Sequence, residues 1–473
     1  MARDGTSWIV AAAIGVLALA LRLFGLDRKS VWFDEAITHF DAHVPWSRLL
    51  ESIRSDVHPP LHYVLYHLWP GVDAGDFWLR LPAALLGAGA AVVAWAWARR
   101  IGTPVQALLT GAFVALAPLQ IDLAQEARMY GLLLLLSAAS LLLLDRVLTC
   151  PRRTTVAAYA VVASLMLYTH YYAAFLLAAE GASALFALHG ASRQAARRAL
   201  AALIVAGCAF VPWLPILVEQ ARNIQGDYWI QTPTLTTLWV TFRELAAHTP
   251  PDEPFRIALR AAYVVQAGLL VLGAALAARQ PRQRSALLLG VVPLGLALGV
   301  SLLVAPVFAV RYVSPIGLAF GFLLARGITG LPQPAALIAG AVAALPIVVS
   351  LPALYLDPGY SRSDLRAAAQ AVQSQRQPNE IVLHLGAFTA APFDYYRVAP
   401  PGQVLETNNR AELCQALRQH TGGWLVTAYQ PGDDEARQAA EGGITSTAYA
   451  AEVARQPPSR FNGVSVFRLS PDC

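Results

Sequence analysis

Residues 7–36 read SWIVAAAIGVLALALRLFGLDRKSVWFDEA, an apolar stretch that ends in two adjacent carboxylates, Asp34 and Glu35. A helix needs about 20 mostly apolar residues to cross a hydrocarbon core about 30 Å thick, which matches the run from 7 to 26. The sequence therefore predicts a first membrane span that is followed at once by acidic groups at the bilayer surface. Its weakly basic start, Arg3 beside Asp4, favours a retained span over a cleaved signal peptide.

The whole chain has the composition of an integral membrane protein. Of its 473 residues 56% are hydrophobic and 14% are charged, with a mean hydropathy of +0.48, whereas a soluble domain is about one quarter charged. The net charge of +5 is spread between apolar runs, which is typical of membrane topology and not of nucleic-acid binding. We expect membrane lipids, and no nucleic acid, among its partners.

Hydropathy predicts an all-α polytopic domain over residues 1–353. About eleven candidate spans lie near 7–26, 79–98, 104–120, 129–145, 154–169, 171–188, 199–218, 257–277, 285–305, 310–325 and 334–353. Alternate connections carry clusters of arginine, of which Arg99-Arg100 and Arg152-Arg153 are examples. By the positive-inside rule these connections face the cytoplasm, so the segments 27–78, 121–128, 219–256 and everything after 354 face outward.

The composition changes after residue 353. Short apolar runs at Ile381 to Leu385, Trp424 to Ala428 and Val464 to Phe467 alternate with polar, helix-like stretches. Residues 354–473 therefore predict a small C-terminal α/β domain outside the cytoplasm, which either helps to select an acceptor or serves as a passive lid. Cys414 and Cys473 both lie in it and could form a disulfide or remain free thiols.

The first outer loop, residues 27–78, has the strongest chemical signal. It contains eight acidic residues, four basic ones, five histidines and nine aromatics. Phe33, Ile37 and Phe40 recur at helical spacing, which predicts an interfacial helix with Asp34 and Glu35 in its first turn. The acidic pair could cap that helix, or a carboxylate there could accept a proton from an attacking hydroxyl group.

Further along the same loop, Asp56 and His58 precede Pro59-Pro60, with His62 and Tyr63 just after. The prolines fix the backbone and so define the direction of His58. Asp56 and His58 could hold a phosphate, pair with each other, or supply two ligands to a divalent metal. Two ligands do not make a complete set, so the metal and any other cofactor stay unknown.

Two arginines lie where outward-facing connections enter spans. Arg128 lies between Glu126 and Tyr130, and Arg311 precedes Tyr312. Either arginine could anchor its helix at the interface or bind a phosphate oxygen bidentately. A cluster at Tyr168, His170, Tyr171 and Tyr172 is interpreted mainly as an aromatic belt at the membrane interface.

Taken together, these motifs resemble the GT-C superfamily of membrane glycosyltransferases, especially bacterial proteins similar to protein O-mannosyltransferases and the lipid A aminoarabinose transferases. The resemblance covers roughly the first 330 residues and is based on Asp34-Glu35, Asp56 to Leu61, Glu126 to Tyr130, and Arg311-Tyr312 followed by Pro315. The aminoarabinose transferases have a lysine immediately before their Pro-Pro, where this chain has His58.

The resemblance implies transfer of a sugar, with inversion, from a polyprenyl-phosphate donor to a glycan, lipid or protein acceptor outside a bacterial plasma (inner) membrane. It implies Asp34 as the catalytic base, helped by Glu35. The implied donor-phosphate ligands are His58, Arg128, Arg311 and Tyr312. The implied substrate-binding residues are Asp56, Glu126, Tyr130, His62 and Tyr63.

The main alternative is a transporter or flippase of a lipid-linked sugar. Transporters usually place ionisable groups or broken helices near the bilayer midplane, whereas here the charges gather at one face of the predicted spans. That pattern favours chemistry at the membrane surface. A non-catalytic scaffold and an oligosaccharide ligase are further alternatives.

Overall fold

The computed structural model describes residues 5–189, 193–223, 230–248, 256–357, 360, 362–385, 387–398, 403–405, 415, 417–428 and 459–469. Its helices are α1 (Gly5–Leu23), α2 (Phe33–His43), α3 (Trp46–Ser55), α4 (Leu61–His67), α5 (Asp76–Ile101), α6 (Pro104–Leu116), α7 (Pro118–Ala124), α8 (Tyr130–Thr149), α9 (Arg153–Thr169), α10 (Ala173–Ala187), α11 (Arg193–Phe210), α12 (Leu214–Asn223), α13 (Leu235–Ala246), α14 (Arg256–Ala278), α15 (Arg284–Leu303), α16 (Val310–Val313), α17 (Gly317–Ile328), α18 (Gln333–Leu356), α19 (Leu365–Gln375) and α20 (Ala387–Tyr395). The strands are β1 (Ile381–Leu385), β2 (Gln403–Leu405), β3 (Gly423–Ala428), β4 (Ser459–Phe461) and β5 (Val464–Leu469).

The chain divides into two compact units. The first, called here the helical unit, comprises Met1–Phe24, Val44–Trp69 and Arg80–Tyr355. The second, called here the sheet unit, comprises Gly25–His43, Pro70–Leu79 and Leu356–Cys473. The first outer loop is thus shared between the two units, because its beginning and its end belong to the sheet unit and its middle belongs to the helical unit.

The helical unit identifies the chain as an integral membrane protein. In the described residues six helical segments are long and apolar enough to cross a membrane, and a seventh is obtained if α6 and α7, bent by 52°, form one span. All eleven predicted spans fall on helices, but three are not continuous helices. The third bends between α6 and α7, the seventh contains a 3-10 turn at Val211–Trp213, and the tenth contains one that includes Pro315. The polytopic helical fold is therefore confirmed, with fewer helices of full spanning length than hydropathy alone predicts.

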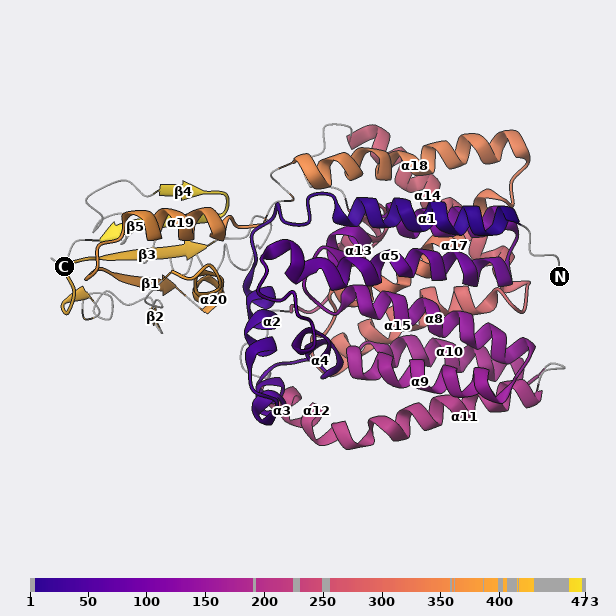
Figure 1. Cartoon of the computed structure of the whole chain (residues 1–473). Coiled ribbons are helices and arrows are strands. Elements are labelled where there is room, and N and C mark those ends of the chain that lie inside the picture. Colours follow the sequence, from indigo (N-terminus) through magenta and orange to yellow (C-terminus); the bar gives the residue numbers. More distant parts are fainter. Residues whose placement is uncertain are drawn as a thin grey trace. The chain divides into compact units, whose positions relative to one another are not determined.

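Neighbouring helices of this unit run side by side, as α8, α9 and α10 do in Figure 1. Close approach depends on small residues where α14 meets α17. A Cβ at Gly273 would lie 1.9 Å from the carbonyl oxygen of Leu323, and one at Gly327 would lie 2.0 Å from that of Leu269. The two backbones touch only because both positions are glycine, a packing mode that is common between membrane helices.

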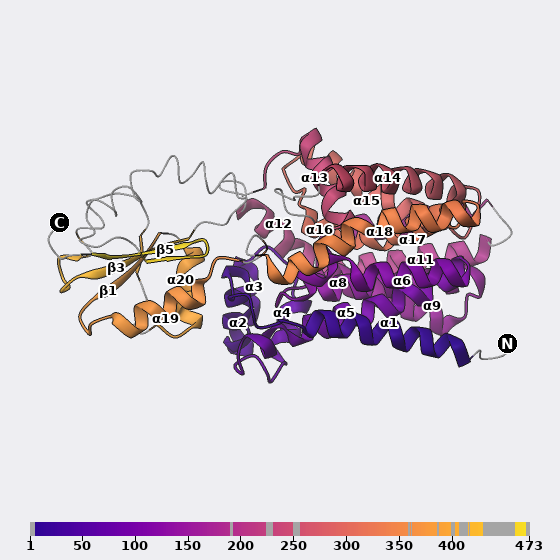
Figure 2. The ribbon, with the colours of Figure 1, turned by 90° about the horizontal axis from the view of Figure 1, so that it is seen from above.

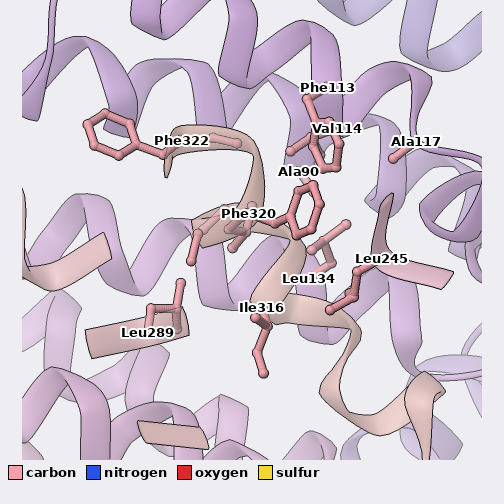
Figure 3. Close-up of a cluster of buried hydrophobic side chains, with 14 of the residues drawn as sticks. Ala90, Phe113, Val114, Ala117, Leu134, Leu245, Leu289, Ile316, Phe320 and Phe322 are labelled. Atoms are coloured by element: carbon pink, nitrogen blue, oxygen red, sulfur yellow. The ribbon is translucent and has the colours of Figure 1, made fainter. Parts of the chain in front are cut away.

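The core of the helical unit is apolar and continuous. Figure 3 shows Phe113 of α6 beside Phe320 of α17, with Leu134, Leu245 and Ile316 around them. The two phenyl rings are stacked with centroids 5.3 Å apart, the separation at which aromatic pairs add to the free energy of burial. This core fixes the ends of the helices to which the polar residues are attached.

The end of the helical unit that carries the arginine-rich connections is held by Asp145, near the end of α8. Its carboxylate accepts a hydrogen bond of 2.5 Å from Arg100 and hydrogen bonds of 2.9 to 3.1 Å from Arg282. Arg100 ends α5, and Arg282 lies between α14 and α15. The connections that hydropathy assigns to one side of the membrane therefore meet at one end of the bundle.

The sheet unit contains the predicted α/β domain. Its five-stranded sheet has the order β2-β1-β3-β5-β4, in which β1 pairs in parallel with β2 and β3, and β5 pairs antiparallel with β3 and β4. Figure 2 shows α19 and α20 on one side of the sheet. Val372, Phe393 and Trp424 are among the residues that form its core. Cys414 and Cys473 lie outside the described residues, so their predicted alternatives are not tested.

The segment 27–78 forms helices α2, α3 and α4. The face of α2 that is most buried is not the predicted apolar stripe, because it carries Glu35, Ala36, Thr38 and Asp41. Glu35 is turned inward by an ion pair within the sheet unit, described below, which leaves Phe33 and the other apolar positions only half-buried.

Candidate active site

The helical unit gathers a set of polar residues that come from four separate parts of the sequence. We call this set the histidine–arginine cluster, and it consists of Asp56, His58, His62, Tyr63, Arg128, His170 and Tyr312. Asp56 follows α3, and the Pro59-Pro60 pair then starts α4 with Pro60 as its N-cap. Since proline is favoured at a helix start, the sequence sets both the position of α4 and the direction of His58.

Asp56 is the acidic member of the cluster. Its carboxylate accepts hydrogen bonds from the Tyr63 hydroxyl group and from the Val57 backbone N–H. Burial by itself would raise the pKa of Asp56, but His58, the charge of Arg128 and the bond from Tyr63 outweigh it and hold the pKa well below its ordinary value. Asp56 is therefore ionised at neutral pH, and it serves as the counter-charge of the cluster.

Arg128 supplies the positive charge. The residue is 3% exposed, and its Nη2 donates to Nδ1 of His58 over 3.3 Å. Burial of a guanidinium group costs free energy unless an anion pairs with it. A phosphate is suited to be that anion, because its oxygens match the planar geometry of the guanidinium N–H groups.

His170 contributes a donor that has no partner within the part of the chain the structure describes. It is 3% exposed, and its Nδ1 accepts a hydrogen bond of 3.1 Å from the Tyr172 backbone N–H. The hydrogen of the neutral ring must therefore be on Nε2, which is buried without a partner. The centroid of the His170 ring lies 4.8 Å from that of Tyr312 and 5.4 Å from that of His58.

Both His62 and His170 are uncharged at neutral pH. Burial is the main cause that lowers the pKa of each ring well below 6.5, and the charges of Arg128 and His58 lower it further. The rings can donate hydrogen bonds without adding charge. The cluster is thus polar, and Arg128 is its only member with a permanent positive charge. Such a set of donors can bind an anion such as phosphate without holding it irreversibly.

The other residues predicted for this site are less closely tied together. Glu126 and Tyr130 are buried on either side of Arg128, and the ring centroid of Tyr130 lies 6.4 Å from that of His170. Tyr312 joins the cluster through its ring contacts with His58 and His170. Arg311 is half-buried beside it on α16. By sequence alone, the group that contains His170 was interpreted mainly as an aromatic belt. The only sequence feature that could have indicated a role in the site was its position directly before Tyr171 and Tyr172, on the side predicted to face outward.

The geometry does not favour a metal between Asp56 and His58. His58 Nδ1 lies 3.6 Å from Asp56 Oδ1, but the Arg128 guanidinium group is directed at that same nitrogen. Among the described residues the only group of three His, Cys, Asp or Glu side chains with a suitable spacing lies elsewhere. An anion fits this cluster better than a cation does.

The predicted catalytic pair lies at the start of α2, in the sheet unit. Glu35 is fully buried, and its Oε2 accepts a hydrogen bond of 3.1 Å from Arg362. Arg362 in turn lies over the ring of Trp32, 4.8 Å from its centroid. Glu35 thus fixes the first turn of α2, and Asp34, half-buried, is the carboxylate of the pair that is more open to solvent.

A second group of contacts fixes the same segment within the sheet unit. Asp76 accepts hydrogen bonds of 2.5 Å from Arg366, 3.0 Å from Tyr395 and 2.9 Å from Tyr396. The Tyr396 hydroxyl oxygen accepts a bond of 2.8 Å from the backbone N–H of Val31. The stretch Asp394 to Arg397, a polar patch by sequence, therefore holds the segment that leads into α2.

The structure thus joins His58, Arg128, Tyr312, Asp56, His62 and Tyr63 in one cluster and adds His170 to it. Asp34 and Glu35 belong to the other unit, so their convergence with the cluster stays a prediction.

Two kinds of solved structure with a similar fold match most of the chain. ArnT from Cupriavidus metallidurans matches in the apo state with a TM-score of 0.62 at 12% identity, and bound to undecaprenyl phosphate with a TM-score of 0.59 at 14% identity, over 98% of both chains in each case. The Archaeoglobus fulgidus oligosaccharyltransferase in complex with Zn and sulfate matches with a TM-score of 0.55 at 10% identity, over 89% of this chain and 68% of that one. No family model and no curated protein sequence matches.

The chain therefore shares the fold of ArnT and of this oligosaccharyltransferase, in agreement with the fold that the resemblance predicted. Identities this low extend the similarity to the fold alone.

Proposed function

We propose that this protein transfers a sugar from a polyprenyl-phosphate donor to an acceptor at the outer face of a bacterial plasma membrane. The observation that carries the proposal is the histidine–arginine cluster. Its buried Arg128 and the Nε2 of His170, which has no partner among the described residues, suit the phosphate of the donor lipid. The ArnT structure bound to undecaprenyl phosphate supports the same class of ligand.

In the proposed reaction Asp34 accepts the proton of the acceptor hydroxyl group. The acceptor oxygen forms a bond to the anomeric carbon while the bond from that carbon to the phosphate oxygen breaks, and the configuration is inverted. The electron pair stays on the leaving lipid phosphate, whose developing charge Arg128, His58 and His170 would stabilise. Glu35, already paired with Arg362, acts as a positioning residue for α2.

Sidedness is part of the proposal. Arg128 lies just before α8 and Asp145 near its end. The cluster and the arginine-rich end are therefore separated by about 23 Å along the helix, at a rise of 1.5 Å per residue. If the arginine-rich end is cytoplasmic, as the positive-inside rule requires, the cluster is outside. The acceptor would then be a glycan, lipid or protein of the periplasm or cell exterior.

The transporter alternative depends on ionisable groups inside the bundle, and one such group is Glu180 of α10. It is 1% exposed and accepts hydrogen bonds of 2.8 Å from Ser140 and 2.7 Å from Tyr159. These bonds join α10 to α8 and α9, so Glu180 has a structural reason to be buried. We therefore keep glycosyl transfer as the proposed function.

The test compares Asp34→Asn with Asp27→Asn, an exposed carboxylate in the same loop. Purified full-length protein would be given radiolabelled polyprenyl-phosphate mannose or aminoarabinose with envelope extract, and transfer would be measured as labelled product formed. Loss of a general base lowers turnover by about 10²–10⁴-fold, so D34N should lose transfer while it keeps undecaprenyl phosphate binding and D27N keeps both. Wild-type turnover in D34N would exclude Asp34 as the base. Protein-dependent lipid movement across proteoliposomes that persists in D34N would instead indicate a flippase.

A further inference from the structure

A second cluster of ligand-type side chains lies in the sheet unit and has no part in the proposed reaction. His39 Nε2 lies 3.0 Å from Asp73 Oδ1, and His43 Nε2 lies 2.7 Å from Asp73 Oδ2. One ligand atom from each of the three residues falls within 4.8 Å of the others. His39 and His43 are on α2, and Asp73 is in the segment 70–79 of the same compact unit.

The two histidines share one face of α2 because residues four apart on a helix lie one above the other. Their ring centroids are 4.5 Å apart. This spacing is the one by which helices present two imidazole nitrogens to a single metal ion. The carboxylate of Asp73 completes a set of two nitrogens and one oxygen, which matches sites of the zinc type that keep a fourth position open for water.

The tautomer of His43 is fixed in the way that metal-binding histidines require. Its Nδ1 lies 2.7 Å from the backbone carbonyl oxygen of His39, which can only accept, so Nδ1 must carry a hydrogen. The contact of Nε2 with Asp73 over 2.7 Å needs a proton as well, and a bound metal ion would replace that proton and accept the lone pair of Nε2. Donation of the other ring N–H to a carbonyl group is the usual arrangement around a metal-bound histidine.

His39 is held by packing instead. The ring lies edge-on to Tyr395, with centroids 4.9 Å apart and planes at 88°, and it also contacts Phe40. These contacts direct Nε2 toward Asp73 without occupying it. His39 and His43 contact different oxygens of Asp73, at 3.0 and 2.7 Å, and one ligand atom from each residue lies within 4.8 Å of the others. Tetrahedral zinc at about 2.0–2.1 Å from its ligands separates neighbouring ligand atoms by about 3.3 Å, so the three side chains would have to adjust by at most about 1.5 Å to share one ion.

We propose that His39, His43 and Asp73 bind a divalent cation of the zinc class, which joins the C-terminal end of α2 to the segment 70–79. Glu35 and Arg362 hold the other end of the same helix. The metal would therefore fix α2 at both ends and stabilise the folded sheet unit by mass action. This site is independent of glycosyl transfer, so either proposal can fail without the other.

The test uses full-length protein purified with an affinity tag that contains no histidine. After chelation, Zn²⁺ binding would be measured by titration calorimetry and metal content by mass spectrometry. One ion per chain is expected, and His43→Gln or Asp73→Asn should weaken binding at least about 10-fold. The apparent melting temperature of the wild type should rise with Zn²⁺, and that rise should be absent in both variants.

Two controls separate this site from other histidines. The first control is His67→Gln, because His67 lies in the same loop but outside the proposed site. The second is His248→Gln, in the helical unit, because His248 hydrogen-bonds Glu244 and its Nε2 lies 3.8 Å from Asp122. Both variants should keep the bound ion. The wild type also provides a test that needs no variant, because tetrahedral Co²⁺ at this site should give strong visible absorption that Zn²⁺ abolishes. The proposal would be overturned if the wild type showed neither this absorption nor one Zn²⁺ per chain. It would also be overturned if Zn²⁺ binding were lost only in His248→Gln.

Discussion

The two ends of helix α8 both carry buried charge, and they differ in how that charge is satisfied. Near its C-terminal end, Asp145 is 7% exposed and accepts hydrogen bonds from Arg100 and Arg282. Just before its N-terminal end, Arg128 lies beside His58, with a histidine donor nearby that has no partner in the described residues. The first arrangement is complete without a ligand, whereas the second leaves a donor for one.

This difference separates structural charge from charge that serves binding. A buried polar group that lacks a partner costs roughly 1–3 kcal/mol, so such a group needs an explanation, and beside a buried guanidinium group a bound anion provides one. The Asp145 network should matter for stability and not for donor binding. The histidine–arginine cluster should show the opposite pattern.

The largest effect is expected from Arg128. Arg128→Ala removes the only fixed cation of the histidine–arginine cluster, and loss of one partner of a buried charge pair costs 2–5 kcal/mol or more. Undecaprenyl phosphate affinity should therefore fall by about 10²–10³-fold, measured with labelled lipid in detergent. Arg128→Lys should give an intermediate loss, because an ammonium group keeps the charge without the bidentate geometry.

The matched controls for Arg128 are Arg54→Ala, on the exposed surface of α3, and Arg282→Ala at the other end of the bundle. Both should bind the lipid phosphate as the wild type does. An Arg128→Ala protein that is folded and keeps full affinity would remove Arg128 from the phosphate site, whereas full affinity in Arg128→Lys would show that charge without bidentate geometry is sufficient.

The next effect is expected from His170. His170→Phe keeps the ring packing against Tyr312 but removes the Nε2 donor, and a hydrogen bond to a charged group contributes about 1.5–3 kcal/mol. Affinity for undecaprenyl phosphate should fall about 10–100-fold, while His170→Gln, which retains an N–H donor, should lose less. Equal affinity in His170→Phe and the wild type would show that this donor does not reach the phosphate.

A smaller effect, and only on stability, is expected from Asp145. Asp145→Asn removes the negative charge that Arg100 and Arg282 share, both of which are partly exposed. The cost should be about 1–3 kcal/mol, seen as a lower apparent melting temperature in detergent. Undecaprenyl phosphate binding should stay within about twofold of the wild type, and a comparable loss of binding would contradict the division between the two ends.

The sequence was sufficient for the helical framework and for the charged ends of α8. Apolar length alone located helices at all eleven predicted spans, because a membrane helix must satisfy its own backbone hydrogen bonds. Shared sidedness was enough to group His58 with Arg128, which lie 70 positions apart. Both inferences depend on patterns that are local or that repeat along the chain.

What the sequence could not show were pairings between distant side chains of ordinary type. Glu35 and Arg362 are 327 positions apart, and Asp73 meets two histidines that lie 30 and 34 positions before it. The cluster that contains His170 was interpreted mainly as an aromatic belt. Only the three-dimensional structure shows that Nδ1 of His170 accepts a hydrogen bond and that its Nε2 has no partner in the described part of the chain. Such information is carried by packing and by hydrogen-bond geometry.

The last prediction concerns pH, and it sharpens the same comparison through His170. Burial, with the charges of His58 and Arg128, holds the pKa of this ring well below 6.5, so between 6.5 and its folded-state pKa the unfolded chain binds a proton that the folded chain does not. Stability therefore falls as the pH is lowered through 6.5, by about 1.4 kcal/mol per pH unit for one such histidine. His62 contributes with the same sign, again mainly through burial.

His170→Phe removes one of these two contributions. The apparent melting temperature of His170→Phe should therefore decrease less than that of the wild type when the pH is lowered from 7 to 5.5. Asp145→Asn, in contrast, should lower the melting temperature at both pH values by a similar amount, so its pH dependence should match that of the wild type. A His170→Phe protein with the full pH dependence of the wild type would mean that His170 is charged in the folded state. Its Nε2–H would then remain a donor, and its positive charge at low pH would add to that of Arg128, so the histidine–arginine cluster would bind phosphate more strongly at low pH.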